Sequence, residues 1–136
     1  MNPFLEWYRR VLALGIVANL AFFVGIFAAP RPILEFLEIP IPPLIWPRAV
    51  VMLVVLISLA YIPGWIDPVR YRWGAYYTIA ARAAGSSFFV TQVWLGNARG
   101  FLNLALYDFS FGAVEGMLLF VGYHVAARGL RASTSH

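Results

Sequence analysis

Three ionisable side chains, Arg82, Asp108 and Glu115, lie within long apolar stretches of this 136-residue chain. An ionised side chain near the centre of a bilayer costs about 2.5–3.5 kcal/mol on insertion scales, so each of the three needs a partner. In such a place a carboxylate can exchange a proton, hold a ligand or pair with an arginine. The surroundings of these residues are therefore the first candidate for a functional site.

The depth of each residue along its stretch predicts which of these side chains meet. If residues 74–95 and 103–125 form adjacent antiparallel helices, Arg82 and Glu115 lie at nearly the same depth. Asn19 stands in the middle of an earlier apolar stretch and reaches the same level. We therefore expect an Arg82–Glu115 pair with an amide beside it.

Asp108 is predicted to lie further from the centre, at the depth of Gln92 on the neighbouring helix, and Gln92 is its expected partner. The alternative is that Asp108 reaches the outer headgroups. The cluster has two interpretations: a structural pair that fixes helix register, or the lining of a ligand pocket or proton path. Contacts to another chain are a third alternative. The candidate residues are Arg82, Glu115, Asp108, Asn19 and Gln92. We assign no catalytic residue and no metal ligand.

Several kinds of chemistry lack the residues that they need. The chain has no cysteine, which removes thiolate ligands and cysteine nucleophiles. A di-iron carboxylate bundle needs Glu-x-x-His pairs, and neither of the two histidines provides one. A haem held by two histidines is excluded within the chain because only His124 lies near an apolar stretch. No cofactor is predicted, and a protein without enzymatic activity is favoured.

The composition indicates an integral membrane protein. The chain is 62% hydrophobic and 12% charged, with a mean hydropathy of +0.76. Soluble domains are about 45–50% apolar and about 25% charged. All ten basic residues are arginines, scattered over several loops rather than gathered in one stripe, so a nucleic-acid partner is not expected.

The apolar residues form four blocks, which predict one membrane domain over residues 1–136. The fold class is all-α, an up-down four-helix transmembrane bundle. The expected spans are residues 11–29, 47–63, 74–95 and 103–125. A proline-rich outer loop, residues 30–46, holds at most a short surface helix, and residues 126–136 form a basic tail.

Arginine counting predicts the orientation. The side with both termini and the turn at 63–73 carries six arginines, and the opposite side carries three. The positive-inside rule then places both termini in the cytoplasm. Tyr8 is interpreted as a residue at the headgroup level. Aromatic residues near the span ends are interpreted as an interfacial belt: Trp46, Trp65, Trp73, Trp94 and Tyr107.

The order of four short spans resembles the DoxX-like group of small bacterial four-helix membrane proteins. The similar residues are Trp46-Pro-Arg48, Asp67-Pro-Val-Arg-Tyr-Arg72, Arg82-Ala-Ala-Gly85 and Tyr107-Asp-Phe-Ser-Phe-Gly112. The resemblance implies the fold and a bacterial inner-membrane location. Some members of the group look like small subunits of membrane oxidoreductases.

Three functions fit these observations. The first is an accessory or structural subunit of a larger membrane complex, respiratory or redox, whose partners are lipid and other membrane chains or further copies of this one. The second is a binder or transporter of a small molecule at Arg82, Glu115 and Asp108; an anionic or lipid-like ligand would suit Arg82. The third is an isomerase or a quinone-linked enzyme with Asp108 or Glu115 as acid or base.

Overall fold

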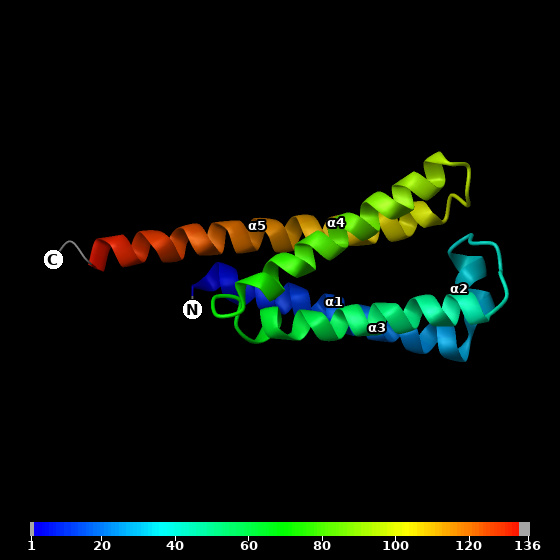
Figure 1. Ribbon diagram of the computed structural model, residues 1–136, viewed down its shortest axis with the longest axis horizontal. Coiled ribbons are helices and arrows are strands. Elements are labelled where there is room, and N and C mark those ends of the chain that lie inside the picture. Colours follow the sequence, from blue (N-terminus) through cyan, green and yellow to red (C-terminus); the bar gives the residue numbers. More distant parts are fainter. Residues whose placement is uncertain (1, 134–136) are drawn as a thin grey trace.

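A computed structural model describes residues 2–133 of the chain, with side chains as far as Arg128. This part is all helical and contains no strand, which confirms the all-α class. The helices are α1 (Pro3–Ala28), α2 (Pro30–Phe36), α3 (Ile45–Ile66), α4 (Arg72–Trp94) and α5 (Phe101–Ser133) (Figure 1). The predicted tail is helical to Ser133, and residues 134–136 lie outside the described part.

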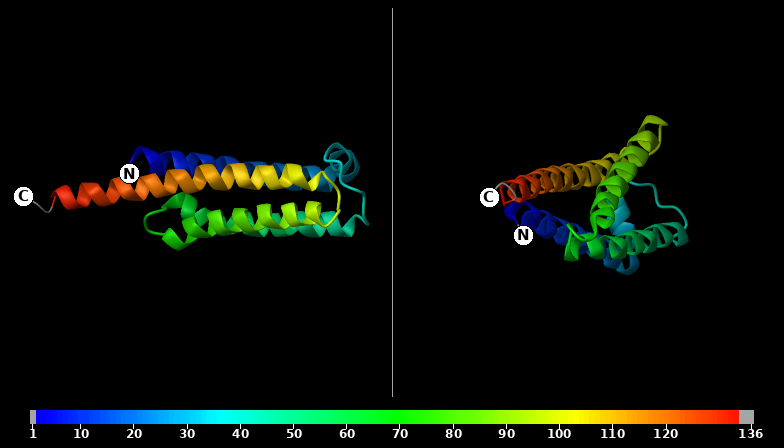
Figure 2. Two further views of the ribbon diagram at one scale, coloured as in Figure 1. Left: turned by 90° about the horizontal axis from the view of Figure 1, so that it is seen from above. Right: turned by 60° about the vertical axis from the view of Figure 1, so that its left-hand side comes forward.

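The four long helices pack as a ring in which α1 and α4 each contact both α3 and α5. The start of α1, the end of the described part of α5 and the turn at residues 67–71 lie at one end, which we call the terminal end (Figure 1). The opposite end, the loop end, carries α2, the loop at residues 37–44 and the turn at residues 95–100 (Figures 1 and 2). Successive long helices therefore run up and down.

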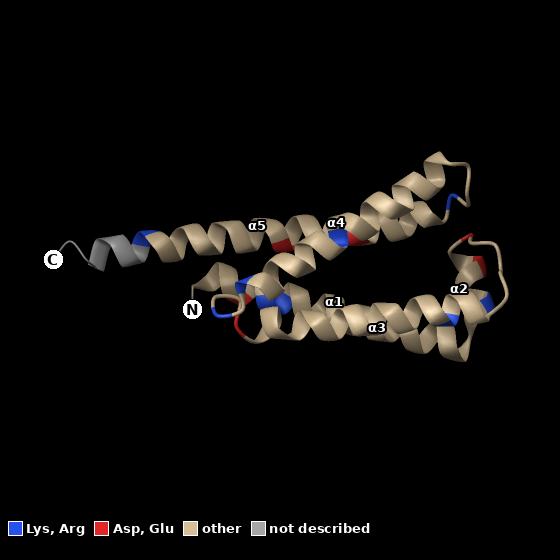
Figure 3. Ribbon diagram, viewed as in Figure 1, with Lys and Arg blue, Asp and Glu red and all other residues tan. Residues whose placement is uncertain are grey.

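Three of the helices are long and apolar enough to cross a membrane: α1, α3 and the Phe101–Arg128 part of α5. Helix α4 has 23 residues, yet its polar side chains leave it less apolar than those three. Figure 3 shows the charged residues gathered towards the two ends, with a separate group midway along α4 and α5. That group contains the residues singled out by the sequence.

Helix α1 begins earlier than predicted. Asn2 caps it by accepting a hydrogen bond from the Leu5 N–H at 3.1 Å, and Pro3 occupies the first turn, where its missing N–H costs nothing. Residues 3–10, which precede the predicted span, are therefore helical. Tyr8 is fully buried, and the interpretation of this residue as a headgroup anchor is wrong.

Helix α3 continues through Pro63-Gly64, a pair that the sequence analysis placed in the following turn. It ends at Ile66, with the Asp67 N–H bonded to the Pro63 carbonyl at 3.1 Å. A methyl group added at Gly64 would lie 2.9 Å from the Ala75 nitrogen, so α3 and α4 approach closely here. This close packing maintains the helix beyond the proline.

The short helix expected in the proline-rich loop is present as α2. Glu38 follows it with φ 56°, in the left-handed region. The Glu38 and Ile39 N–H groups bond to the Glu35 and Leu34 carbonyls at 3.0 and 2.9 Å, which is a Schellman ending. The chain is thereby turned back across the loop end, where Gly100 packs against the backbone of Leu37.

The two halves of the ring are packed differently. The terminal half is centred on a buried cluster to which all four long helices contribute: Leu5, Tyr8, Leu12, Tyr61, Ala75 and Leu119. The loop half has a smaller cluster, Ile26, Leu34 and Val51, drawn from α1, α2 and α3. Figures 1 and 2 show the outer part of α4 leaning away from α1 and α3 in this half.

Candidate functional site

Arg82 is the centre of the buried polar cluster. Its side chain is 1% exposed, and its Nε lies 3.5 Å from Oε1 of Glu115, whose side chain is fully buried. Its Nη1 donates to Oδ1 of Asp108 at 3.1 Å. The predicted Arg82–Glu115 pair is present, and both carboxyl groups of α5 share this one guanidinium of α4.

Asp108 does not pair with Gln92, so that prediction is wrong. The Gln92 Oε1 instead accepts a hydrogen bond from the Asn97 Nδ2 at 2.9 Å. Matching depths by helix rise places α-carbons, whereas the Arg82 side chain is long enough to reach a carboxylate on another turn of α5. Gly85, one turn along α4, leaves room for the Asp108 carboxylate, because an added methyl group would collide with Oδ2.

Three aromatic rings surround the Arg82 guanidinium, and we call them the aromatic cage. The guanidinium carbon lies 5.8 Å from the ring centroid of Tyr61, 5.4 Å from that of Tyr107 and 4.8 Å from that of Phe111. Rings at these distances attract a cation through their negative faces. The cage therefore takes the place of water around the charge.

The aromatic cage was not predicted from the sequence. Tyr107 was assigned to the interfacial belt, yet it is half-buried and lies against Arg82. A signal was available, because Tyr107, Phe111 and Glu115 follow one another at four-residue spacing and so share a helix face. Residues on the face that carries a buried carboxylate point into the bundle rather than towards headgroups.

Asn19 lies beside the cluster without bonding to its charges. Its Nδ2 donates to the Ser58 Oγ at 2.9 Å, and its Oδ1 accepts from the Tyr107 hydroxyl at 3.1 Å. Ser58 in turn donates to the Val54 carbonyl at 2.8 Å. The amide expected next to the Arg82–Glu115 pair therefore joins α1, α3 and α5, and it reaches the guanidinium only through Tyr107.

Three glycines provide the space that the charged side chains occupy. Nη2 of Arg82 lies where a methyl group at Gly15 would stand, and the Asp108 carboxylate occupies the same position at Gly85. A methyl group at Gly112 would lie 3.2 Å from the Arg82 Cβ. The ion pairs therefore depend on missing side chains in three helices.

The cluster is incompletely hydrogen bonded within the described part of the chain. Both Oε atoms of Glu115 and the Nε and Nη2 atoms of Arg82 are buried and have no hydrogen-bond partner there. Removing charged groups from water costs several kcal/mol each, which an ion pair offsets only with good geometry. A buried ion pair with unbonded polar atoms is therefore weak evidence for a stabilising role. For this reason we consider the cluster a candidate functional site.

A cavity of about 490 Å³ occupies the loop half and reaches the cluster. Its walls are apolar and come from α1, α3, α4 and α5, while α2 and the following loop border its loop end. Polar side chains border it at mid-bundle: Asn19, Tyr61, Arg82, Tyr107 and Asp108. The Asp108 side chain is 20% exposed against 1% for Arg82, so Asp108 is the charged group that the cavity reaches best.

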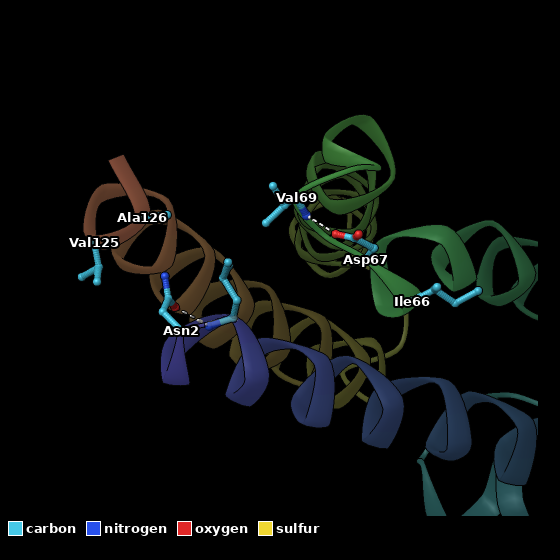
Figure 4. Close-up of a pocket in the computed structure, with 7 residues that line it drawn as sticks. Asn2, Ile66, Asp67, Val69, Val125 and Ala126 are labelled. Atoms are coloured by element: carbon cyan, nitrogen blue, oxygen red, sulfur yellow. Dashed lines mark hydrogen bonds between the residues drawn. The ribbon is translucent and has the colours of Figure 1, made fainter. Parts of the chain in front are cut away.

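A second hollow of about 550 Å³ lies at the terminal end (Figure 4). Its polar side chains are already engaged. Asn2 caps α1 and donates to the Gly122 carbonyl at 2.7 Å, while the Asp67 carboxylate accepts the Val69 and Arg70 N–H groups at 2.9 Å. Among the described residues, none of the buried side-chain atoms without a hydrogen-bond partner lines this hollow, so it is not a candidate site.

Among the residues that the structure describes, no group of three His, Asp or Glu side chains could hold a metal ion. Comparison with protein-family models, with curated proteins and with solved structures finds no significant match to this chain. The resemblance to the DoxX-like group stays a prediction. The arrangement itself, an apolar cavity with a partly exposed carboxylate at one end, is suited to holding a molecule with an apolar body and one polar end.

Proposed function

We propose that this chain is an integral membrane protein that binds an amphiphilic small molecule in the cavity of its loop half. The observation that carries the proposal is the cavity itself, which ends on Asp108 and Arg82 at mid-bundle. Its volume of about 490 Å³ falls within the range of roughly 300–1,000 Å³ that is typical of ligand pockets. A tightly packed bundle centre would have favoured a purely structural cluster.

The proposal includes all four long helices as membrane spans. Helix α4 is the least apolar of them, yet Arg82 is paired with two carboxylates on α5, which offsets part of the cost of placing it in a bilayer. The arginine distribution supports an orientation with both termini in the cytoplasm. The cavity then opens in the outer half of the membrane, below α2.

The residues that line the cavity also support a ligand with an apolar body and one polar end. Phe22, Phe88 and Leu104 stand among its apolar walls, and these would hold a hydrocarbon or ring system. The polar groups are confined to the mid-bundle end, so the polar end of the ligand points to Asp108 and its apolar end to α2.

A cavity-filling substitution tests the proposal. The wild-type protein and a Leu104→Trp variant are purified in a mild detergent, and molecules that remain bound are measured by native mass spectrometry and identified in organic extracts. Leu104 lines the cavity, so the variant should lose the bound molecule. The matched control is Leu106→Trp on the same helix, because Leu106 is 54% exposed on the outer surface. Equal occupancy of the two variants would overturn the proposal.

An accessory subunit in a larger complex stays the second candidate. Its support is the exposed aromatic surface, with Phe36 of α2 85% exposed and Trp94 of α4 84% exposed at the loop end. A partner chain or lipid headgroups would cover these rings equally well. Recovery of stoichiometric partner chains after native purification would favour this function, and a clean monomer or homodimer would count against it.

A further inference from the structure

We infer that the ligand of the loop-half cavity is a lipophilic cation whose positively charged end pairs with the Asp108 carboxylate. This inference rests on the proposed function and adds the chemical class of the ligand. Four observations carry it: the charge balance of the cluster, the enclosure of Arg82, the exposure of Asp108 and the position of Gly85.

The charge balance comes first. Asp108 and Glu115 both pair with the guanidinium of Arg82, at 3.1 and 3.5 Å. With all three groups ionised, two carboxylates and one guanidinium carry a formal charge of minus one. An uncompensated charge at this depth is costly, and a cation brought by a ligand would neutralise it.

Arg82 is not available to an anion. Its guanidinium is enclosed by the aromatic cage of Tyr61, Tyr107 and Phe111, and its Nη2 is directed at Gly15 of α1, which is not part of the cavity lining. The side chain is 1% exposed. The anionic ligand that the sequence suggested for Arg82 would have to displace a carboxylate or a ring to reach it.

Asp108 presents the free acceptor. Its Oδ1 accepts from Arg82, whereas no described residue donates a hydrogen bond to Oδ2. Oδ2 lies over Gly85, which itself lines the cavity, and the side chain is 20% exposed. An ammonium group entering along the apolar walls therefore meets a carboxylate oxygen with unused capacity, in surroundings where charge-assisted hydrogen bonds are strong.

Glu115 contributes without touching the ligand. It is fully buried, is not part of the cavity lining, and has no hydrogen-bond partner in the described part of the chain. The Glu115 carboxylate would partly neutralise the Arg82 guanidinium. The Asp108 carboxylate would then be less fully neutralised by Arg82 and would still attract a cation. Glu115 is a positioning residue rather than a ligand contact.

The test uses three molecules with one tail and different ends: decylamine, decanol and decanoate, each brominated at the far end of the tail. The full-length protein is placed in phosphatidylcholine nanodiscs. Trp46 lines the cavity towards the loop end, where the tail would end, so binding is read as quenching of its fluorescence. A Trp46→Phe variant supplies the background, and an excess of unbrominated compound shows which part of the quenching is saturable.

We expect decylamine to bind about tenfold or more tightly than decanol, and decanoate to bind weakest, because Asp108 presents a carboxylate oxygen without a hydrogen-bond donor at the polar end of the cavity. Asp108→Asn should remove the preference for the amine while decanol still binds. Glu115→Gln should reduce the same preference with the lining unchanged. The order of the three binding affinities for the wild-type protein tests the inference even if a variant fails to fold.

Equal binding of the three molecules, or tightest binding of decanoate, would overturn the cationic class and leave the proposed function standing. If none of the three molecules binds, but the wild-type protein retains a molecule that the Leu104→Trp variant loses, the cationic class is again overturned and the proposed function stands. Absence of binding in both experiments would overturn the proposed function as well, so the two failures are distinguishable.

Discussion

The terminal half and the loop half of this bundle are made from the same four long helices, but the terminal half is closely packed and the loop half contains a cavity. In the terminal half, Leu12, Tyr61 and Leu119 are buried to 3% exposure or less in a cluster shared by all the long helices. In the loop half, the buried cluster does not include α4 or α5, and about 490 Å³ between the helix pairs is left to the cavity.

The difference follows from the side chains that each half contains. Gly64 and Gly74 bring α3 and α4 together at the terminal end, where Tyr8 also bonds to Thr78 of α4 at 3.1 Å. Further along α4, small residues follow Arg82, and α2 occupies the loop end above them. The closely packed side chains of the terminal half stabilise the bundle, whereas the loop half contains the cavity in which we propose that a ligand binds.

The largest expected effect lies at the boundary between the halves. Arg82→Ala should destabilise the protein by about 3–5 kcal/mol, because it leaves Asp108 and Glu115 buried without their cation. Thermal unfolding in detergent measures the loss. A triple variant, Arg82→Met with Asp108→Leu and Glu115→Leu, removes all three charges and should unfold far closer to the wild type. Equal losses in the two proteins would show that the pairing is unimportant.

Two leucine truncations on α5 compare the halves directly. Leu119→Ala removes a buried side chain from the terminal cluster and should cost about 2–3 kcal/mol. Leu104→Ala only enlarges a space that already exists, and should cost less than about 1 kcal/mol. Denaturant or thermal unfolding of both variants gives the comparison. A cost at Leu104 as large as that at Leu119 would mean that the loop half is as closely packed as the terminal half.

The glycines are expected to give smaller losses than Arg82 or Leu119. Gly85→Ala forces the Asp108 carboxylate to move, and we expect a loss of about 1–2 kcal/mol and weaker ligand retention. Gly116→Ala is the matched control, since its nearest neighbour atom would lie 3.8 Å away in ordinary contact. That variant should be neutral or stabilised by about 0.5 kcal/mol, because alanine favours the helix. Similar melting temperatures for the two variants would contradict the tight fit of Asp108 over Gly85.

Much of the arrangement could be predicted from the sequence. The apolar blocks predicted the long helices, and the depths of Arg82 and Glu115 predicted their pairing. The partner of Asp108 could not be obtained in this way, because a long arginine side chain reaches beyond the level of its own α-carbon. The burial of Tyr8 and Tyr107 was missed for a related reason, since an aromatic residue near a span end suits the interface and the interior equally well.

The sequence by itself determined that the chain is helical, apolar and supplied with three buried charges that must find partners, because hydrophobicity and the cost of burying charge are properties of the residues. Only the tertiary structure decided that both carboxylates share Arg82, that three aromatic rings enclose it, and that Asp108 borders a cavity. These features depend on how closely the helices pack. Gly15, Gly85 and Gly112 allow this packing because they have no side chain in the space that Arg82 and Asp108 occupy.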